Sequence, residues 1–234
     1  MALYVLSDTH LSLSTGKPMD VFGARWKDHA ERIAFFMKRD LTNDDVTVIP
    51  GDVSWGMDLK EARDDLRFLD ALPGKKILGK GNHDYWWSTQ TKINAFFEKE
   101  NLKTLSLLFN NAYSVGNIAV CGTRGWYFDA ASPAGTDRDK IVAREAGRLR
   151  RSLEAGRAFN AAESVVFMHF PPVFGDFECR ELTGVLKEFG VKRCYYGHLH
   201  AQYDVPRAFT HDGVSYRIAS SDYLQFMPLK VSEE

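Results

Sequence analysis

Cysteine is scarce in this sequence. The 234 residues include three cysteines, Cys121, Cys179 and Cys194, and none of them forms a Cys-x-x-Cys pair. An odd count without that spacing argues against a disulfide framework and against a thiolate zinc site. We therefore expect core thiols in a reducing compartment and assign no chemistry to Cys179.

Long apolar runs and an excess of one charge are also missing. No apolar run approaches the ~20 residues of a membrane span, and the chain enters a predicted strand without a basic-then-apolar leader. A net charge of -1 gives no global field that would attract nucleic acid or an anionic membrane. Since no repeat, low-complexity segment or linker interrupts the chain, we expect a single domain over residues 1–234. The cysteine usage and the lack of a leader or membrane span predict a cytoplasmic location.

The first half of the chain alternates between short apolar segments and amphipathic ones. Strands are predicted at 3–6, 46–49 and 77–78, and the helices that follow them at 24–39, 59–72 and 89–100. Strand–helix alternation of this kind predicts parallel strands joined by right-handed crossovers.

The second half has a different rhythm. Three closely spaced apolar segments, separated by Asn110-Asn111 and Gly116-Asn117, predict antiparallel pairing. These segments are 105–109, 112–115 and 118–121. A loop is then expected over 122–136, helices over 137–157 and 178–189, strands over 165–168 and 192–196, and two short strands within 214–229.

Polar motifs follow five of the predicted strands. They contain five of the seven histidines, and the other two, His29 and His211, are interpreted as surface or hydrogen-bonded core residues. Because ligand sites in open α/β sheets form at the carboxyl ends of the strands, we expect the motifs to meet. The motifs are Asp8-Thr9-His10, Gly51-Asp52, Gly81-Asn82-His83-Asp84, His169-Phe170-Pro171-Pro172 and Gly197-His198-Leu199-His200.

These motifs allow three interpretations: a metal site, a general acid–base site, or structural hydrogen bonding. Imidazole and carboxylate ligands suit Mn, Fe and Zn, and a single ion does not need so many groups. We therefore favour two ions with a carboxylate between them. The seven candidate ligands are Asp8, His10, Asp52, Asn82, His169, His198 and His200.

The charge of such a centre indicates the substrate. Two divalent ions carry about four positive charges, which Asp8, Asp52 and a bridging hydroxide neutralise only in part. The remainder favours an anion, and phosphate oxygens are hard ligands that suit these metals. Two ions about 3.5–4 Å apart convert water to hydroxide and bind both oxygens of an in-line displacement, which predicts hydrolysis at phosphorus.

In their order along the chain, the five motifs resemble those of the calcineurin-like metallophosphoesterase superfamily. The resemblance runs from Asp8 to His200, and although each motif alone is weak, the five in order are specific. It implies an α/β fold in which two mixed β-sheets pack as a sandwich and are flanked by helices, in four layers. It also implies two divalent or trivalent metal ions, Mn, Fe or Zn.

The resemblance assigns a role to each motif residue. Asp8, His10 and His200 would bind the first metal, Asn82, His169 and His198 the second, and Asp52 would bridge them. His83 would bind no metal. It would protonate the leaving oxygen or stabilise the pentacoordinate phosphorus, and an imidazole pKa near neutrality suits that proton transfer.

The sequence departs from the family three positions after Asp52. Many relatives have an acidic residue or a histidine there, which orients the catalytic histidine, but this chain has Trp55, which cannot accept such a hydrogen bond. Asp84 and Asp58 are the alternatives for orienting His83. The paired arginines of the protein Ser/Thr phosphatases are also missing, which disfavours a phosphoprotein substrate.

Three weaker features have two interpretations each. The aromatic run Tyr85-Trp86-Trp87 is expected to pack beneath the site, with stacking of a substrate base as the alternative. Arg124 is a candidate phosphate contact, although a solvated loop arginine is favoured. Arginines on the helix predicted over 137–157 are expected to form a solvated, ion-paired face, namely Arg144, Arg148 and Arg151.

We therefore expect a binuclear metal-dependent phosphoesterase that hydrolyses a small-molecule phosphodiester or nucleotide. A metal-bridged hydroxide would attack phosphorus while His83 assists the leaving group. A nuclease is the nearest alternative and would gain support if the arginine face bordered the pocket. A catalytically weak scaffold that binds a protein partner ranks lower because the ligand set is complete. No membrane partner is expected, and substrate-binding residues are not assigned.

Overall fold

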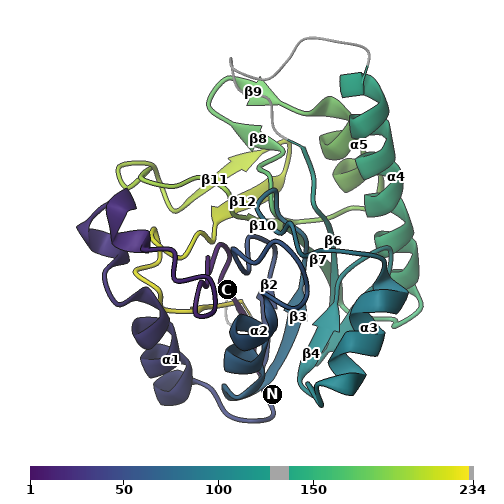
Figure 1. Cartoon of the computed structure of the whole chain (residues 1–234). Coiled ribbons are helices and arrows are strands. Elements are labelled where there is room, and N and C mark those ends of the chain that lie inside the picture. The colour runs from purple at the N-terminus through teal and green to yellow at the C-terminus, as the bar shows by residue number, and fades with distance from the viewer. Residues whose placement is uncertain (127–136, 232–234) are drawn as a thin grey trace.

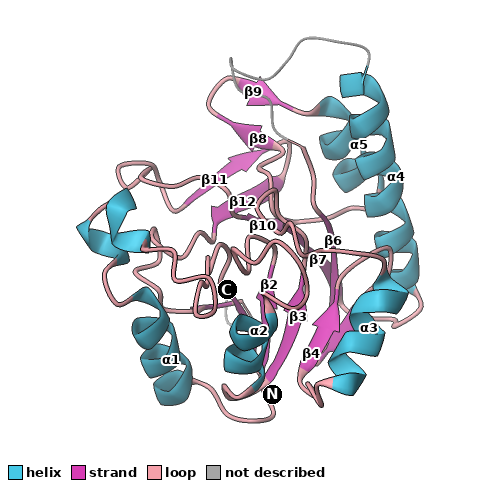
Figure 2. Ribbon diagram, in the orientation of Figure 1, coloured by secondary structure: helices cyan, strands magenta, loops and turns pink. Residues whose placement is uncertain are grey.

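A computed structural model describes residues 1–126 and 137–231, so most of the loop predicted over 122–136 lies outside the described residues. The chain forms two mixed β-sheets that pack together and are flanked by helices (Figure 1), as the sequence predicts. Figure 2 separates the strands from the helices that cover them. Within the described residues, no helix is both long enough and apolar enough to cross a membrane.

The first sheet has the strand order β13-β1-β2-β3-β4, and its central strands are parallel. Strand β13 pairs antiparallel with β1. The predicted alternation of strands and helices is confirmed. The strands are β1 (Leu3–Val5), β2 (Val46–Ile49), β3 (Lys75–Leu78), β4 (Leu105–Leu107) and β13 (Leu229–Lys230), and the connecting helices are α1 (His29–Asp40), α2 (Arg63–Asp70) and α3 (Gln90–Lys99).

The helix predicted from residue 24 begins later, at His29. Two short 3-10 turns, η1 (Met19–Phe22) and η2 (Ala24–Trp26), precede it. The chain cannot run as one helix here because Asp28 adopts the left-handed conformation with φ 52°. Trp26 is buried beside the candidate site described below.

The predicted antiparallel pairing of the segment at 105–109 is wrong. Strand β4 lies parallel to β3 in the first sheet, with Lys76 opposite Leu105, because the intervening helix α3 returns the chain in the same direction. The turn at Asn110, which has φ 60°, then carries the chain into the second sheet instead of forming a hairpin. Strands β5 (Tyr113–Val115) and β6 (Ile118–Thr123) do pair antiparallel, as predicted.

The second sheet has the order β11-β12-β10-β7-β6-β5, with antiparallel edge strands and parallel central ones. The short strands β8, β9 and β11 were not predicted. The remaining elements are α4 (Asp137–Arg157), β7 (Glu163–Met168), β8 (Val173–Phe174), β9 (Phe177–Glu178), α5 (Arg180–Glu188), β10 (Arg193–Tyr196), β11 (Ala208–His211) and β12 (Val214–Ile218).

Alternate residues of the second sheet belong to two different cores. On β7, Val165 and Phe167 pack with the first sheet, whereas Val166 and Met168 pack with residues of α4 and α5. This period of two follows from the pleat of a strand and gives helix, sheet, sheet and helix layers. The three cysteines are buried and free, as the sequence predicts.

The two sheets meet at the carboxyl ends of their parallel strands. Just after β1, the Ser7 N–H donates to the Ala219 carbonyl at 2.8 Å, and the Ser221 N–H donates to the Ser7 carbonyl at 2.9 Å. The loops that follow strands of both sheets therefore come together at one edge.

Candidate metal centre

The loops after β1 and β2 run side by side in an uncommon backbone conformation. The Asp8 N–H donates to the Gly51 carbonyl at 3.0 Å, and the His10 N–H donates to the Asp52 carbonyl at 2.9 Å. Asp8, His10, Asp52 and His198 all have φ between 43° and 69°. Non-glycine residues in this region are strained and concentrate at functional sites, where the surrounding structure fixes them.

Two glycines allow the loops to approach one another. A Cβ atom on Gly81 would lie 2.0 Å from Asp52 Oδ1, and one on Gly197 would lie 2.2 Å from Asp8 Oδ2. Neither space can hold a side chain, so glycine at these positions is what brings the Asn82 loop and the His198 loop against the first sheet.

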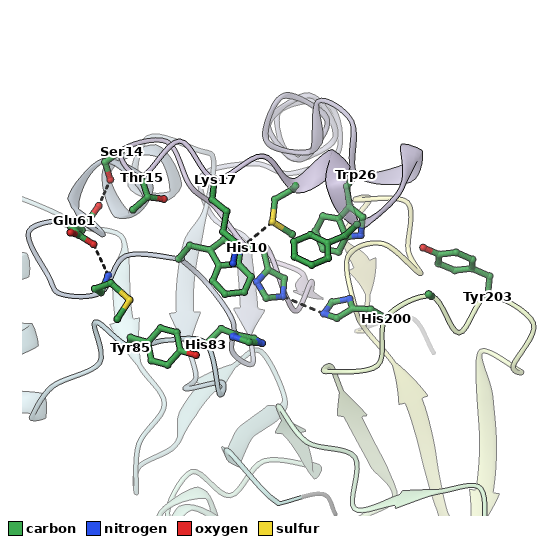
Figure 3. A pocket seen from close by; sticks show the side chains of 15 residues that line it. His10, Ser14, Thr15, Lys17, Trp26, Glu61, His83, Tyr85, His200 and Tyr203 are labelled. Carbon is green, nitrogen blue, oxygen red and sulfur yellow. Dashed lines mark hydrogen bonds between the residues drawn. The ribbon is translucent and has the colours of Figure 1, made fainter. Parts of the chain in front are cut away.

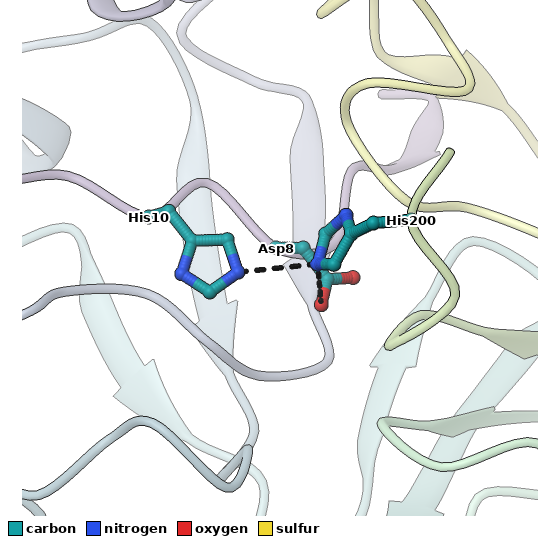
Figure 4. A group of neighbouring side chains, drawn as sticks. All are labelled: Asp8, His10 and His200. Carbon is teal, nitrogen blue, oxygen red and sulfur yellow. Dashed lines mark hydrogen bonds and ion pairs between the residues drawn. The ribbon is translucent and has the colours of Figure 1, made fainter. Parts of the chain in front are cut away.

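The first group of candidate ligands consists of Asp8, His10 and His200 (Figure 4). His10 Nε2 and His200 Nε2 lie 3.2 Å apart, and His200 Nε2 lies 3.5 Å from Asp8 Oδ1. Asp8 and His10 come from the first sheet and His200 from the loop after β10, so this group joins the two sheets.

The second group contains Asn82, His169 and His198. Asn82 Oδ1 lies 2.7 Å from His169 Nε2 and 3.1 Å from His198 Nδ1. Asp52 lies between the groups, because its Oδ2 is 3.5 Å from His10 Nε2 and 3.6 Å from His169 Nε2. The structure thus brings all seven predicted ligands together.

Burial gives these groups unusual charge states. Burial and the neighbouring carboxylate of Asp8 raise the pKa of Asp52 to about 9. Burial also lowers the pKa of His169 to about 3 and that of His10 well below its ordinary value. Burial would raise the pKa of Asp8 as well, but the hydrogen bond to His200 and the nearby imidazoles bring it below its usual range.

The residues fit a cationic metal. Two fully buried carboxylates facing one another are costly unless positive charge is supplied between them. Among the described residues, His10 Nδ1 and His169 Nδ1 have no hydrogen-bond partner. Carboxylate, amide and imidazole donors together suit Mn, Fe or Zn.

The sequence matches a family model over residues 1–202, that of the calcineurin-like phosphoesterases. The chain belongs to the calcineurin-like phosphoesterase family. No curated protein matches it significantly. Solved structures share the fold at low sequence identity. AQ665 from Aquifex aeolicus, described as a protein of unknown function, is 16% identical with a TM-score of 0.52. The match covers 98% of this chain and 95% of that one. TT1561 of Thermus thermophilus is 10% identical with a TM-score of 0.57, covering 94% and 89%.

Asp222 is a residue of this phosphoesterase-family site that the sequence analysis missed. Its buried carboxylate accepts from His200 Nδ1 at 2.9 Å, from the Ala201 N–H at 3.0 Å and from the Tyr203 hydroxyl at 3.1 Å. The bond to Nδ1 leaves Nε2 of His200 to face Asp8, which is the arrangement of a metal-binding histidine and its supporting carboxylate. Asp222 follows β12, so it has the same strand-end position as the predicted ligands.

His83, the expected catalytic residue of this family member, is held by aromatic rings. Its ring centroid lies 4.5 Å from that of Trp55, which in turn lies 4.9 Å from that of His10. Within the described residues, His83 Nδ1 has no hydrogen-bond partner, and the His83 N–H donates to Asp52 Oδ1 at 2.8 Å. Trp55 therefore occupies the space beside His83 as a packing surface.

Neither acid considered for orienting His83 does so. Asp84 is buried and accepts hydrogen bonds from the backbone N–H groups of Asp52, Val53 and Gly81 at 2.7–2.8 Å. Asp58 accepts from two backbone N–H groups, at residues 60 and 61. Asp84 instead joins the loops after β2 and β3.

A cavity of about 950 Å³ opens beside the first group of ligands (Figure 3). His10, His83 and His200 form its inner end. Its outer walls are mainly aromatic, and of the Tyr85-Trp86-Trp87 run Tyr85 lines this cavity while Trp86 is buried. The aromatic walls are Phe22, Trp26, Trp55, Tyr85 and Tyr203.

The cavity carries few charges apart from the histidines. Lys17 supplies an ammonium 3.0 Å from the centre of the Trp55 ring, and Glu61 is the one carboxylate among the described lining residues.

The remaining histidines have structural contacts: His29 Nε2 lies 3.3 Å from the His10 carbonyl oxygen, and His211 Nε2 lies 3.5 Å from Glu178.

Proposed function

We propose that this protein is a binuclear metal-dependent phosphoesterase that hydrolyses a small-molecule phosphodiester or nucleotide. The observation that carries the proposal is the convergence of seven carboxylate, amide and imidazole groups from both sheets at one edge. Membership of the calcineurin-like phosphoesterase family supports the same reaction class.

The proposed ligands divide into the two groups described above. Asp8, His10 and His200 would hold one Mn, Fe or Zn ion, Asn82, His169 and His198 would hold the other, and Asp52 lies where it would serve both. When bound, the ions would supply an acidified water as nucleophile and positive charge for the phosphoryl oxygens. The protein supplies the rigid, water-poor setting for these groups.

His83 is the proposed proton donor to the leaving oxygen. Its side chain lines the aromatic cavity and is not one of the proposed metal ligands. It is half-buried against Trp55. An imidazole held at this position faces whatever group occupies the cavity. We assign the cavity to the leaving alcohol, which its walls suit best when the alcohol is flat and mostly uncharged.

The proposal is tested by hydrolysis of an aryl phosphodiester and its monoester after loading with manganese. His83→Ala should lower kcat by about 10²–10⁴-fold, the usual contribution of a general acid, while metal content stays at two ions. His211→Ala, a histidine away from the site, serves as the matched control and should match the wild type. If neither ester is cleaved by protein that carries two ions, the scaffold alternative replaces the enzyme.

A nuclease is the second candidate, because one observation favours it. Arg144 and Arg148 border a pocket together with Lys80, two residues before Asn82. A nuclease would bind single-stranded DNA with an affinity that falls steeply between 50 and 200 mM salt, by roughly 300-fold if six phosphates are contacted. Binding that is weak and independent of salt would leave the small-molecule substrate.

We also propose a cytoplasmic location, which the three free, buried cysteines support.

A further inference from the structure

A second pocket, lined by residues near the second group of candidate ligands, has the opposite chemistry to the aromatic cavity. It has a volume of about 420 Å³, with Trp87 and Phe109 among its walls. Four cationic side chains line it, and none of the described lining residues is acidic. The cations are Lys80, Arg124, Arg144 and Arg148.

One of these cations lies on a segment that carries a ligand of the second group, and another lies beside such a segment. Lys80 precedes Asn82 by two residues. The Arg124 carbonyl accepts from the His169 N–H at 3.2 Å, so the Arg124 backbone is paired with the strand end of β7. The pocket therefore lies near Asn82 and His169, which do not themselves line it, whereas His10 and His200 line the aromatic cavity.

Among the described residues, few negative groups compensate the positive charge of this pocket. Glu145 is the nearby acid, but it is fully buried and pairs with Arg148 at 2.6 Å and with the Thr123 hydroxyl at 2.6 Å. Among the described residues, no hydrogen bond or ion pair engages the side chains of Lys80 and Arg144, and the buried Arg124 Nε has no partner. Several unpaired cations around one hollow indicate an anionic ligand.

The start of α3 adds to this potential. Ser88, Thr89 and Gln90 also line the pocket, and the N-terminus of a helix carries partial positive charge. A planar guanidinium such as that of Arg144 or Arg124 matches phosphate oxygens through two hydrogen bonds. Phosphate is the biological anion that this combination of groups recognises best.

We propose that Lys80, Arg124, Arg144 and Arg148 form a subsite for a second phosphate group of the substrate. The inference rests on the proposed phosphoesterase function and narrows its substrate class. The reacting phosphate lies at the metal centre and the leaving alcohol in the aromatic cavity. The retained part of the molecule carries a further phosphate into the cationic pocket. The pocket volume of about 420 Å³ has room for a phosphate group.

The test compares two substrates that differ by one phosphate: thymidine 5'-(p-nitrophenyl phosphate) and the same diester with a 3'-phosphate. Manganese-loaded wild type should favour the 3'-phosphorylated diester by at least about tenfold in kcat/KM, mainly through KM. The double variant Lys80→Gln, Arg144→Gln should bring that ratio to within about threefold of one. Arg150→Gln removes an arginine of the same helix that lies outside both pockets and should keep the wild-type ratio.

The outcomes separate this subsite from the reaction itself. If both diesters are cleaved at equal rates, or if the double variant keeps the preference, the subsite is wrong while the phosphoesterase stands. If neither diester is cleaved, calorimetry in chelator compares the binding of thymidine 3',5'-bisphosphate with that of the 5'-monophosphate. Tighter binding of the bisphosphate by wild type but not by the double variant supports the subsite. Equal affinity of wild type for the two nucleotides overturns it. Saturable binding of inorganic phosphate with a substrate ratio of one would assign the pocket to a free anion and overturn the proposal.

Discussion

At the scale of single residues, Asp222 determines how a predicted ligand presents itself. Burial acts to lower the pKa of His200, but hydrogen bonds to Asp222 and Asp8 raise it to about 10 when no metal is bound. The Asp222→Asn variant removes the charge that fixes Nδ1 of His200 as a donor. We expect manganese affinity to fall by about 10–100-fold, as for other carboxylates that support a metal-bound histidine.

This effect is measured by competition with a chelating dye. The matched control is Tyr203→Phe, which removes another hydrogen bond to Asp222 without touching His200. It should change the affinity by less than about twofold, since the Asp222 carboxylate keeps its charge and its hydrogen bond to His200 Nδ1. An Asp222→Asn protein that binds manganese like the wild type would show that His200 needs no supporting carboxylate.

Trp55 gives a second prediction at this scale. Because its ring lies against both His10 and His83, it limits how the two imidazoles rotate. Trp55→Ala should lower kcat by about tenfold or more, since a displaced catalytic group is less well oriented. Trp55→Phe keeps a flat surface and should stay within about threefold of wild type in a steady-state assay at saturating substrate. Equal kcat values in the two variants would exclude orientation by the ring.

At the scale of the elements, Asp84 joins the loops that follow β2 and β3. It accepts from four backbone N–H groups and from Trp86 Nε1 at 2.9 Å, so both loops depend on its charge. Asp84→Asn would place an amide donor against some of these N–H groups. We expect a loss of about 2–4 kcal/mol in the free energy of unfolding, because buried donors lose a charged acceptor.

Urea denaturation followed by circular dichroism measures this change. Asp58→Asn is the control, since Asp58 also accepts two backbone hydrogen bonds but lies at the surface. Its cost should stay below about 1 kcal/mol, in the range of a surface cap. If Asp84→Asn unfolds at the wild-type midpoint, the two loops are held in place by other contacts.

The elements also show where a sequence pattern suffices. The periodicity of α4 predicts its bounds over 137–157, and that of α3 is correct to within one residue at each end. The same pattern fails at residue 28, where the conformation of one aspartate ends a turn, and at β4, whose partner depends on the crossover of α3. Strands of two residues such as β8 are too short to leave a periodic signal.

At the scale of the whole molecule, the predicted ligands were accessible to sequence reasoning because each occurs in a short motif at the end of a strand. Asp222 and most of the pocket residues were not, since their relation to the centre exists only after the two sheets pack; Arg124 and Tyr85 are exceptions that the sequence singled out. Lys17 and Tyr203, for example, are far apart in sequence yet line one cavity. Arg144 similarly lies on α4, 62 residues beyond Asn82 in the chain, and its place beside that loop follows from the packing of α4 on β6.

The candidate metal centre joins the two sheets, so metal binding should stabilise the whole fold. Asp8, Asp52 and Asn82 follow strands of the first sheet, whereas His169, His198 and His200 follow strands of the second. Without metal, burial and the charge of Asp8 disfavour the charged form of Asp52. Manganese at 100 times its Kd should add about 2.7 kcal/mol per bound ion to the free energy of unfolding, provided that the unfolded chain does not bind it.

For a chain of this size, that free energy corresponds to a rise in Tm of roughly 5–10 °C over protein in chelator. Differential scanning calorimetry measures the rise, and Asp8→Asn should reduce it because the variant removes charge from the first group of ligands. His211→Ala, whose histidine lies outside the centre, should retain it. If Tm is the same in manganese and in chelator, the ligands do not tie the sheets together through bound metal, and the strained loops must be held by their backbone hydrogen bonds alone.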